Sequence, residues 1–168
     1  MTQDKSKTAT VLSSKVKRPT PLSLRERVRK ALTYMLAEGF DTFICPIEQS
    51  VGRTVAELVV RLKMNNPQIK LVVVFEYYRN ELFAQSLVEQ NSYICNKADD
   101  ILYAAYECVR GIPSSIEEYV IVRSSAVILY QREPSLEENY ILEEALRECR
   151  TVLRISAHDG GRSTSPPR

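Results

Sequence analysis

Hydrophobic residues along the chain fall into two alternating patterns. Short, continuous apolar runs rich in β-branched residues predict strands at 42–47, 70–75, 101–105, 126–130 and 151–155. Apolar residues three or four positions apart predict helices at 24–36, 51–62, 79–90, 115–123 and 136–150. Strands that alternate with helices build parallel sheets. The pattern therefore predicts an α/β fold: a single Rossmann-like, doubly wound domain with a mostly parallel sheet of about five strands flanked by helices.

Both ends of the chain lack this pattern. Residues 1–20 are rich in Ser, Thr and Lys, and we expect a disordered, basic N-terminal arm there, with Val11 and Leu12 as a weak trace of a first strand. Residues 157–168 (AHDGGRSTSPPR) predict a disordered C-terminal tail. The predicted domain is therefore 21–156.

The composition limits the classes of protein and of binding site that we expect. The 168 residues are 44% hydrophobic and 26% charged, which is ordinary for a globular protein. No apolar run approaches the ~20 residues of a membrane span. The four cysteines are irregularly spaced and His158 is the only histidine, so we expect reduced thiols typical of a cytoplasmic protein and neither a metal site nor a cofactor.

The net charge of +2 is unevenly distributed. Residues 1–20 carry five basic residues against Asp4, a net of +4; residues 157–168 add about +1, which leaves about −3 for 21–156. A basic arm on an acidic body is typical of a solvated tail, and less often of a segment that contacts nucleic acid.

Glycines are scarce where a nucleotide-binding fold needs them. Only Gly39, Gly52 and Gly111 fall inside the predicted domain. Rossmann-like domains hold phosphate on glycine turns, because a backbone without Cβ can approach the ligand closely. The sequence thus predicts a Rossmann-like fold that lacks the glycine turns by which such folds usually bind phosphate.

Four segments match a known family in their order and spacing. They are EGFDTFICPIEQSVGRTVAELVVRLKMNNPQIKLVVV at 38–74, KADDIL at 97–102, EEYVIVRSSAVILYQ at 117–131, and YILEEAL with VLRI within 140–155. They resemble the YpsA-like branch of the SLOG superfamily, which is related to the DprA and LOG (Lonely Guy) proteins. This resemblance implies a Rossmann-like domain that binds a nucleotide or a nucleotide derivative.

The chain departs from that family where phosphate would bind. Ser50 stands where the family has a glycine, Gly52 where it has an acid, and Val122 where it has an aspartate. The second phosphate turn falls on residues 136–139 (LEEN), which contain no glycine and two acids. Acids at a helix start occupy the positive end of its dipole, so they repel phosphate.

Candidate ligand-binding residues come from the ends of the predicted strands and, for Glu57 and Ser124, from the resemblance. They are Glu48, Gln49, Ser50, Arg53, Glu57, Tyr77, Arg79, Ser124 and Gln131. Structural roles are alternatives: a surface charge for Arg53, a packing ring for Tyr77. The acidic pairs Glu117-Glu118 and Glu143-Glu144 are interpreted as solvated helix faces.

Together these observations predict a degenerate, non-catalytic SLOG-type domain that acts as a nucleotide-derivative sensor or a regulatory interaction module. Two alternatives stay open: a LOG-like nucleoside-monophosphate hydrolase, and a DprA-like protein that associates with nucleic acid through the basic arm. The expected partners are a nucleotide-derived small molecule and a second copy of the chain, forming a homodimer through apolar helices. Nucleic acid is less favoured, and no membrane partner is expected.

Overall fold

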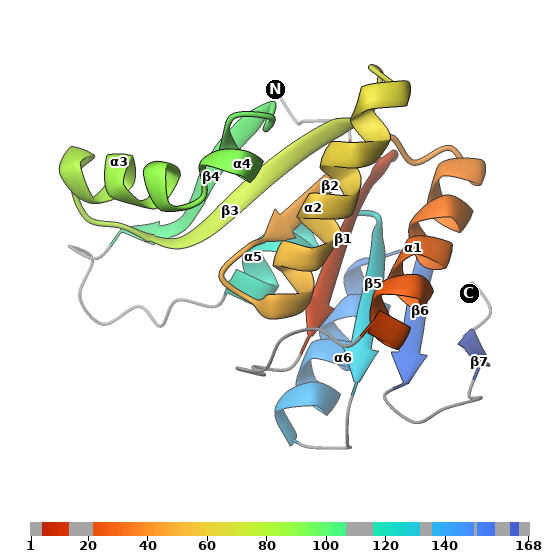
Figure 1. Cartoon of the computed structure of the whole chain (residues 1–168). Helices are drawn as coiled ribbons and strands as arrows, with labels where there is room; N and C mark the ends of the chain where they lie inside the picture. Colours follow the sequence, from red (N-terminus) through yellow and green to blue (C-terminus); the bar gives the residue numbers. More distant parts are fainter. Residues whose placement is uncertain are drawn as a thin grey trace.

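A seven-stranded sheet with the order β4-β3-β2-β1-β5-β6-β7 runs through the protein (Figure 1). The computed structural model describes residues 5–13, 22–106, 116–131, 136–149, 151–156 and 162–164. The strands are β1 (Thr8–Ser13), β2 (Thr42–Pro46), β3 (Lys70–Tyr78), β4 (Asp100–Tyr106), β5 (Ala126–Gln131), β6 (Thr151–Ser156) and β7 (Arg162–Thr164). All pairs from β4 to β6 are parallel. The predicted Rossmann-like α/β class is confirmed.

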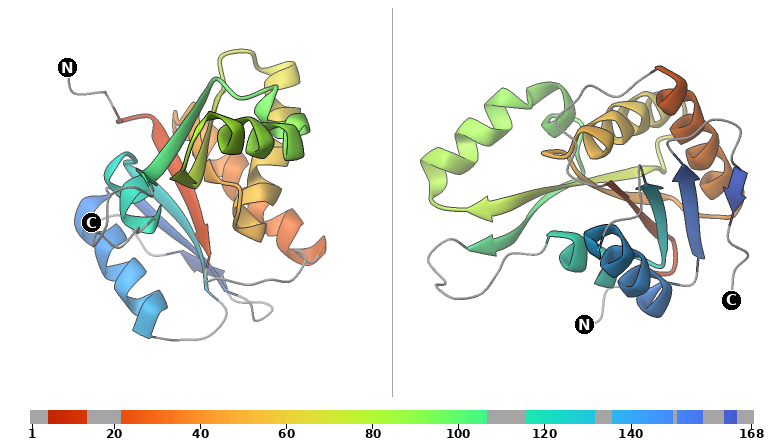
Figure 2. Two further views of the ribbon diagram at one scale, coloured as in Figure 1. Left: turned by 90° about the vertical axis from the view of Figure 1, so that its left-hand side faces the viewer. Right: turned by 90° about the horizontal axis from the view of Figure 1, so that it is seen from below.

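Helices cover both faces of this sheet (Figure 2). They are α1 (Leu22–Ala37), α2 (Ser50–Asn65), α3 (Glu81–Gln90), α4 (Ser92–Cys95), α5 (Ile116–Val122) and α6 (Leu136–Glu148). One buried cluster lies beneath α1, α2 and α4, and a second lies beneath α5 and α6. No helix in the described part of the chain is long and apolar enough to cross a membrane.

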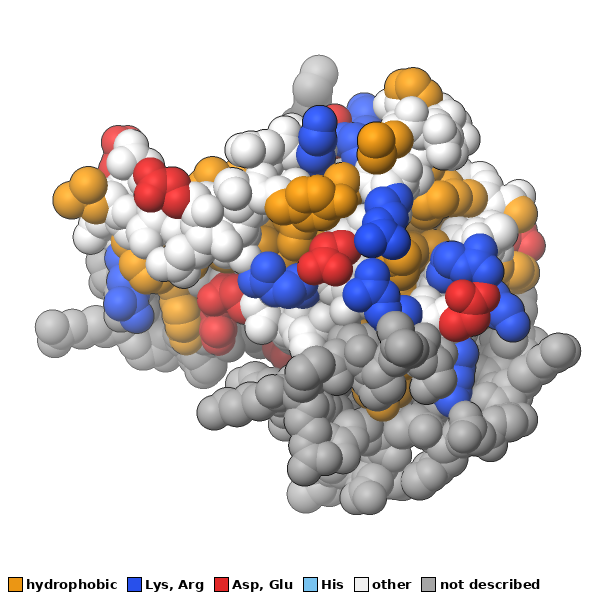
Figure 3. All heavy atoms as spheres, in the orientation of Figure 1, with side chains coloured by type: hydrophobic (Ala, Val, Ile, Leu, Met, Phe, Trp, Pro, Cys, Tyr) orange, Lys and Arg blue, Asp and Glu red, His pale blue; other side chains and the backbone are white. Residues whose placement is uncertain are grey.

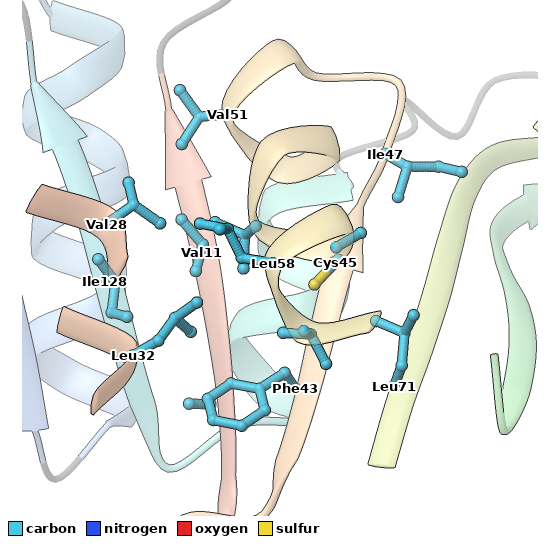
Figure 4. Close-up of a cluster of buried hydrophobic side chains, with 14 of the residues drawn as sticks. Val11, Val28, Leu32, Phe43, Cys45, Ile47, Val51, Leu58, Leu71 and Ile128 are labelled. Atoms are coloured by element: carbon cyan, nitrogen blue, oxygen red, sulfur yellow. The ribbon is translucent and has the colours of Figure 1, made fainter. Parts of the chain in front are cut away.

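The apolar runs of the sequence arise because the central strands are buried on both faces. In β2, Phe43 packs in the cluster under α1 and α2, and the next residue, Ile44, packs in the cluster under α5 and α6. Figure 4 shows Phe43 beside Leu32 of α1, together with Val11 of β1. All three are at most 1% exposed. A strand buried on both faces needs apolar residues at consecutive positions, which removes the alternation of a half-exposed strand.

Strand β1 corrects the predicted domain boundary at residue 21. Residues 8–13 (TATVLS) lie between β2 and β5, at the centre of the sheet, and are not part of a disordered arm. The hydroxyl of Thr10, which is 0% exposed, donates to the carbonyl oxygen of Ile44 at 2.7 Å. Because that bond satisfies the hydroxyl, a polar-looking segment can occupy a buried position. The rest of the proposed arm, apart from residues 5–7, lies outside the described residues.

The predicted C-terminal tail also contains a short strand. Residues 162–164 form β7, which pairs antiparallel with β6 through Arg154 and Ser163 at its middle. The prediction of a disordered tail is therefore wrong for these residues. Of the remainder, 157–161 and 165–168 lie outside the described residues. In the part of the chain that the structure describes, the sheet has six parallel strands and one antiparallel strand, whereas the sequence predicts about five strands.

Strands β3 and β4 extend beyond the rest of the sheet. Pairing of β3 with β2 ends at Val74, whereas pairing with β4 continues to Tyr78 and Tyr106. With α3 beside them, these strands project from the body in Figure 1. We call residues 75–106 the β3–β4 extension.

Asp99 links the β3–β4 extension to α2 through hydrogen bonds. Its carboxylate accepts hydrogen bonds from Lys63 Nζ and, at 2.8 Å, from the Leu71 amide. Partial burial alone raises the pKa of Asp99, but these hydrogen bonds, with the charges of Lys63 and Lys70, outweigh it and lower the pKa overall. A carboxyl whose pKa is lower in the folded state adds stability at a pH above its unfolded pKa of about 4, and loses that contribution as the pH falls through the folded pKa.

We therefore expect Asp99→Asn to lower the free energy of unfolding at pH 7, by less than about 1 kcal/mol because the carboxylate is half exposed. The difference from the unmodified protein should vanish in acid, where Asp99 itself is protonated. Urea unfolding at pH 7 and at the lowest pH at which both proteins fold measures this. A deficit that persists unchanged in acid would contradict an ionic role for Asp99.

Candidate functional site

The carboxyl ends of β1, β5 and β6 lie at one edge of the sheet, where these arrows point down in Figure 1. From β1 the chain winds outward through β2, β3 and β4, and on the other side β5 leads to β6, so the direction switches between β1 and β5. Open α/β proteins bind ligands at such switch points. The segments after β1 and β5, residues 14–21 and 132–135, lie outside the described residues. Of the connections next to the switch point, the structure describes the turn from β2 into α2.

Gly52 allows α2 to begin directly against the end of β2. A Cβ at this position would lie 2.2 Å from the carbonyl oxygen of Pro46. Glycine permits the same close helix–strand packing after the first strand of dinucleotide-binding folds. The first turn of α2 is therefore held at the sheet edge by a backbone contact.

Polar groups surround that first turn. Gln49 is the N-cap of α2, but its side chain makes no capping hydrogen bond. Instead its Nε2 donates to Glu117 Oε1 of α5 at 3.3 Å. Glu48 accepts from the amide of Glu76 at 2.6 Å. Two carboxylates thus flank the start of α2, where the side chain of the N-cap residue makes no capping hydrogen bond.

Arg53, one turn into α2, makes its hydrogen bond outside this cluster of polar groups. Its guanidinium donates to Oδ1 of Asn91, which is 9% exposed and in turn donates to the carbonyl oxygen of Leu87 at 2.8 Å. Burial raises the pKa of the nearby Cys95 thiol, and the charge of Arg53 opposes that rise. Arg53 thus joins α2 to the end of α3 rather than offsetting the acids at the start of α2.

Glu57 and Ser124 do not join the cluster at the start of α2. Glu57 lies 3.8 Å from Arg25 of α1 in a partly exposed ion pair. Figure 3 shows Lys and Arg side chains on the face that α1 and α2 form. Ser124 is 0% exposed, lies two residues before β5, and donates to the carbonyl oxygen of Val120 at 2.8 Å. It therefore lies at the amino end of β5, the opposite edge of the sheet from Gln49.

The surroundings differ among the last three candidates, which are Tyr77, Arg79 and Gln131. Tyr77 follows Glu76, so its backbone lies beside the Glu48 contact. Arg79 lies beyond the end of β3, with its guanidinium 4.7 Å from the ring centre of Phe83. Gln131 ends β5 at the switch edge, but its side chain lies outside the described residues. The structure thus brings together Glu48, Gln49 and Ser50, with Tyr77 adjoining.

Glu117 is the site residue that the sequence interpretation missed. The sequence pattern predicts a solvated helix acid there, yet Glu117 accepts a hydrogen bond from Gln49 across 68 positions of sequence. Its place depends on how the chain crosses from β4 to α5, and no local pattern records that. Among the described residues, no group of three or more His, Cys, Asp and Glu could hold a metal ion.

No protein-family model matches the chain, and no curated protein matches it. The SLOG assignment therefore stays a prediction.

Proposed function

We propose that this domain is a non-catalytic, SLOG-type sensor that binds a nucleotide derivative at the start of α2. The observation that carries the proposal is the contact of Gly52 with Pro46, which fixes an N-terminal helix turn at the carboxyl edge of a doubly wound sheet. First-turn N–H groups and the helix dipole favour a ligand that offers hydrogen-bond acceptors. A regulatory role through a protein partner is the alternative outcome.

The flanking acids define the class of ligand. Glu48 and Glu117 place negative charge beside the helix start, which disfavours ligands with several phosphates. Carboxylates accept hydrogen bonds from ribose hydroxyls, as the acidic residue of dinucleotide-binding folds does. The ligand that fits is therefore a nucleoside or a nucleotide derivative with little negative charge.

The absence of catalysis is part of the proposal. In the resemblance, the second phosphate turn falls on residues 136–139 (LEEN), which contain no glycine and two acids. A turn of this composition offers no close backbone approach to the phosphate of a nucleoside monophosphate, which a hydrolase of the LOG type would have to hold. We expect the bound ligand to be released unchanged.

A thermal-shift screen of nucleosides, nucleoside mono- and diphosphates, cyclic nucleotides and ADP-ribose tests the proposal. A ligand at 100 times its Kd adds about 2.7 kcal/mol, which raises the Tm by about 5–10 °C. We expect the shift to fall as phosphates are added to one nucleoside. A flat response to the whole panel would favour the protein-binding role, and free base released from nucleoside monophosphates would favour the hydrolase.

The Ser50→Asp variant tests whether the ligand binds at the start of α2 or at another site. A carboxylate in the first turn suits the helix dipole, so the variant should fold, but it fills the position the ligand needs. We expect at least about tenfold weaker binding of any ligand found in the screen. Ser92→Asp, at the exposed start of α4, makes the same charge change and should bind normally. Equal binding by all three proteins would place the ligand elsewhere.

A further inference from the structure

We propose that strand β4 is the interface of a homodimer, in which it pairs antiparallel with β4 of a second copy across a two-fold axis at Tyr103. The strand is an edge of the sheet: among the described residues it pairs only with β3. Its outer backbone groups therefore face away from the sheet. Only another strand can pair with such a row of donors and acceptors throughout its length.

β4 has few of the features that prevent an edge strand from pairing with a strand of another chain. Charged side chains, proline and bulges normally prevent edge-to-edge pairing. From Ile101 to Tyr106 the sequence is ILYAAY, without a charge or a proline. Residues 101–105 are only half-buried in the single chain, and Tyr106 is 56% exposed. Hydrophobic side chains also reach the surface elsewhere on the β3–β4 extension (Figure 3).

The sequence of β4 is complementary to itself, which identifies the partner as a second copy. A two-fold axis at Tyr103 places Ile101 opposite Ala105 and Leu102 opposite Ala104. Directly opposed residues of antiparallel strands share a face, so each large side chain there meets a small one.

Polar groups are also complementary in this register. Asp100, the one charged residue of β4, comes opposite Tyr106, whose hydroxyl can donate to the carboxylate. No like charges oppose each other within the strand. The isologous contact satisfies both ends of the interface with the same pair.

The tyrosines are already ordered in the single chain. The ring of Tyr78 lies 5.2 Å from that of Tyr103 and 5.6 Å from that of Tyr106, edge to face in both cases. Tyr103 also stacks on Phe75 at 5.8 Å. Side chains held before association lose less entropy when they bind, which favours pairing at this strand.

Analytical ultracentrifugation of the full chain tests the dimer. We expect a species of about twice the 19.2 kDa chain mass at micromolar concentrations. Ala104→Lys should weaken association at least about tenfold, because lysine is a natural protector of edge strands. Met64→Lys, at a position 77% exposed on α2, should leave it unchanged. A monomer at all soluble concentrations, or a dimer indifferent to Ala104→Lys, would overturn the proposal.

Cysteine cross-linking tests the register independently of that variant. In Tyr103→Cys the two new thiols lie directly opposite one another, with Cβ atoms about 4.5–5.5 Å apart. Mild oxidation should therefore yield a 103–103 disulfide, identified by mass spectrometry. In Tyr106→Cys the two thiols are about 20 Å apart and should not link. A 106–106 disulfide, or none in a folded Tyr103→Cys protein, would refute this register.

Discussion

A chain that begins at residue 14 is expected to lose cooperative folding. The deletion removes β1 from between β2 and β5, which then have no common neighbour. It also removes Ala9, Val11 and Leu12, all at most 1% exposed. A buried Val or Leu contributes about 1.5–3 kcal/mol, and the backbone hydrogen bonds of both neighbouring strands are lost as well. The sum is comparable to a domain's total stability of about 5–15 kcal/mol.

Urea unfolding followed by circular dichroism measures this effect. A chain lacking only residues 1–4 keeps β1 and serves as the control, with a transition expected close to that of the full chain. If the chain that begins at residue 14 unfolds with the same midpoint and slope, residues 8–13 are the dispensable arm predicted from the sequence.

Gly52→Ala is expected to destabilise the protein by about 3 kcal/mol or more. The new methyl group would lie 2.2 Å from the carbonyl oxygen of Pro46, so α2 and the end of β2 must separate. Overpacking a well-packed site costs about 1–3 kcal/mol, and more when the obstacle is backbone that cannot rotate away. The same displacement moves the first turn of α2, so ligand binding should weaken with stability.

Gly39→Ala is the matched control for this substitution. Gly39 has a φ of 95°, which alanine tolerates poorly, but no atom lies within 4 Å of the added Cβ. The expected cost is about 1–2 kcal/mol of backbone strain alone. Equal losses in the two variants, measured by urea unfolding, would show that the contact with Pro46 is not tight.

How far the fold could be predicted depended on how each strand is buried. β3 and β5 were found because burial on both faces leaves the runs LVVVF and AVILY. β1 was hidden because it carries Thr8 and Thr10 among its apolar residues. Threonine is a good strand former, yet it reads as polar unless the partner of its hydroxyl is known.

The candidate site was predictable only where it is local. Glu48, Gln49 and Ser50 form one loop, so the strand end before them identified all three. Ser124 was assigned by motif alone, and its place at the start of β5 puts it at the other edge of the sheet. Glu117 reaches the site through tertiary structure, and the partner of Arg53, Asn91, lies 38 positions further along the chain.

Amide NMR together with product analysis shows whether the start of α2 binds a ligand and leaves it intact. Titration with the best nucleoside or nucleotide derivative of the thermal-shift panel should move the amide signals of Val51 and Gly52 most, and the ligand should be recovered unchanged. Signals that move only elsewhere, no response to any member of the panel, or recovery of a cleaved product would contradict binding without turnover at the start of α2.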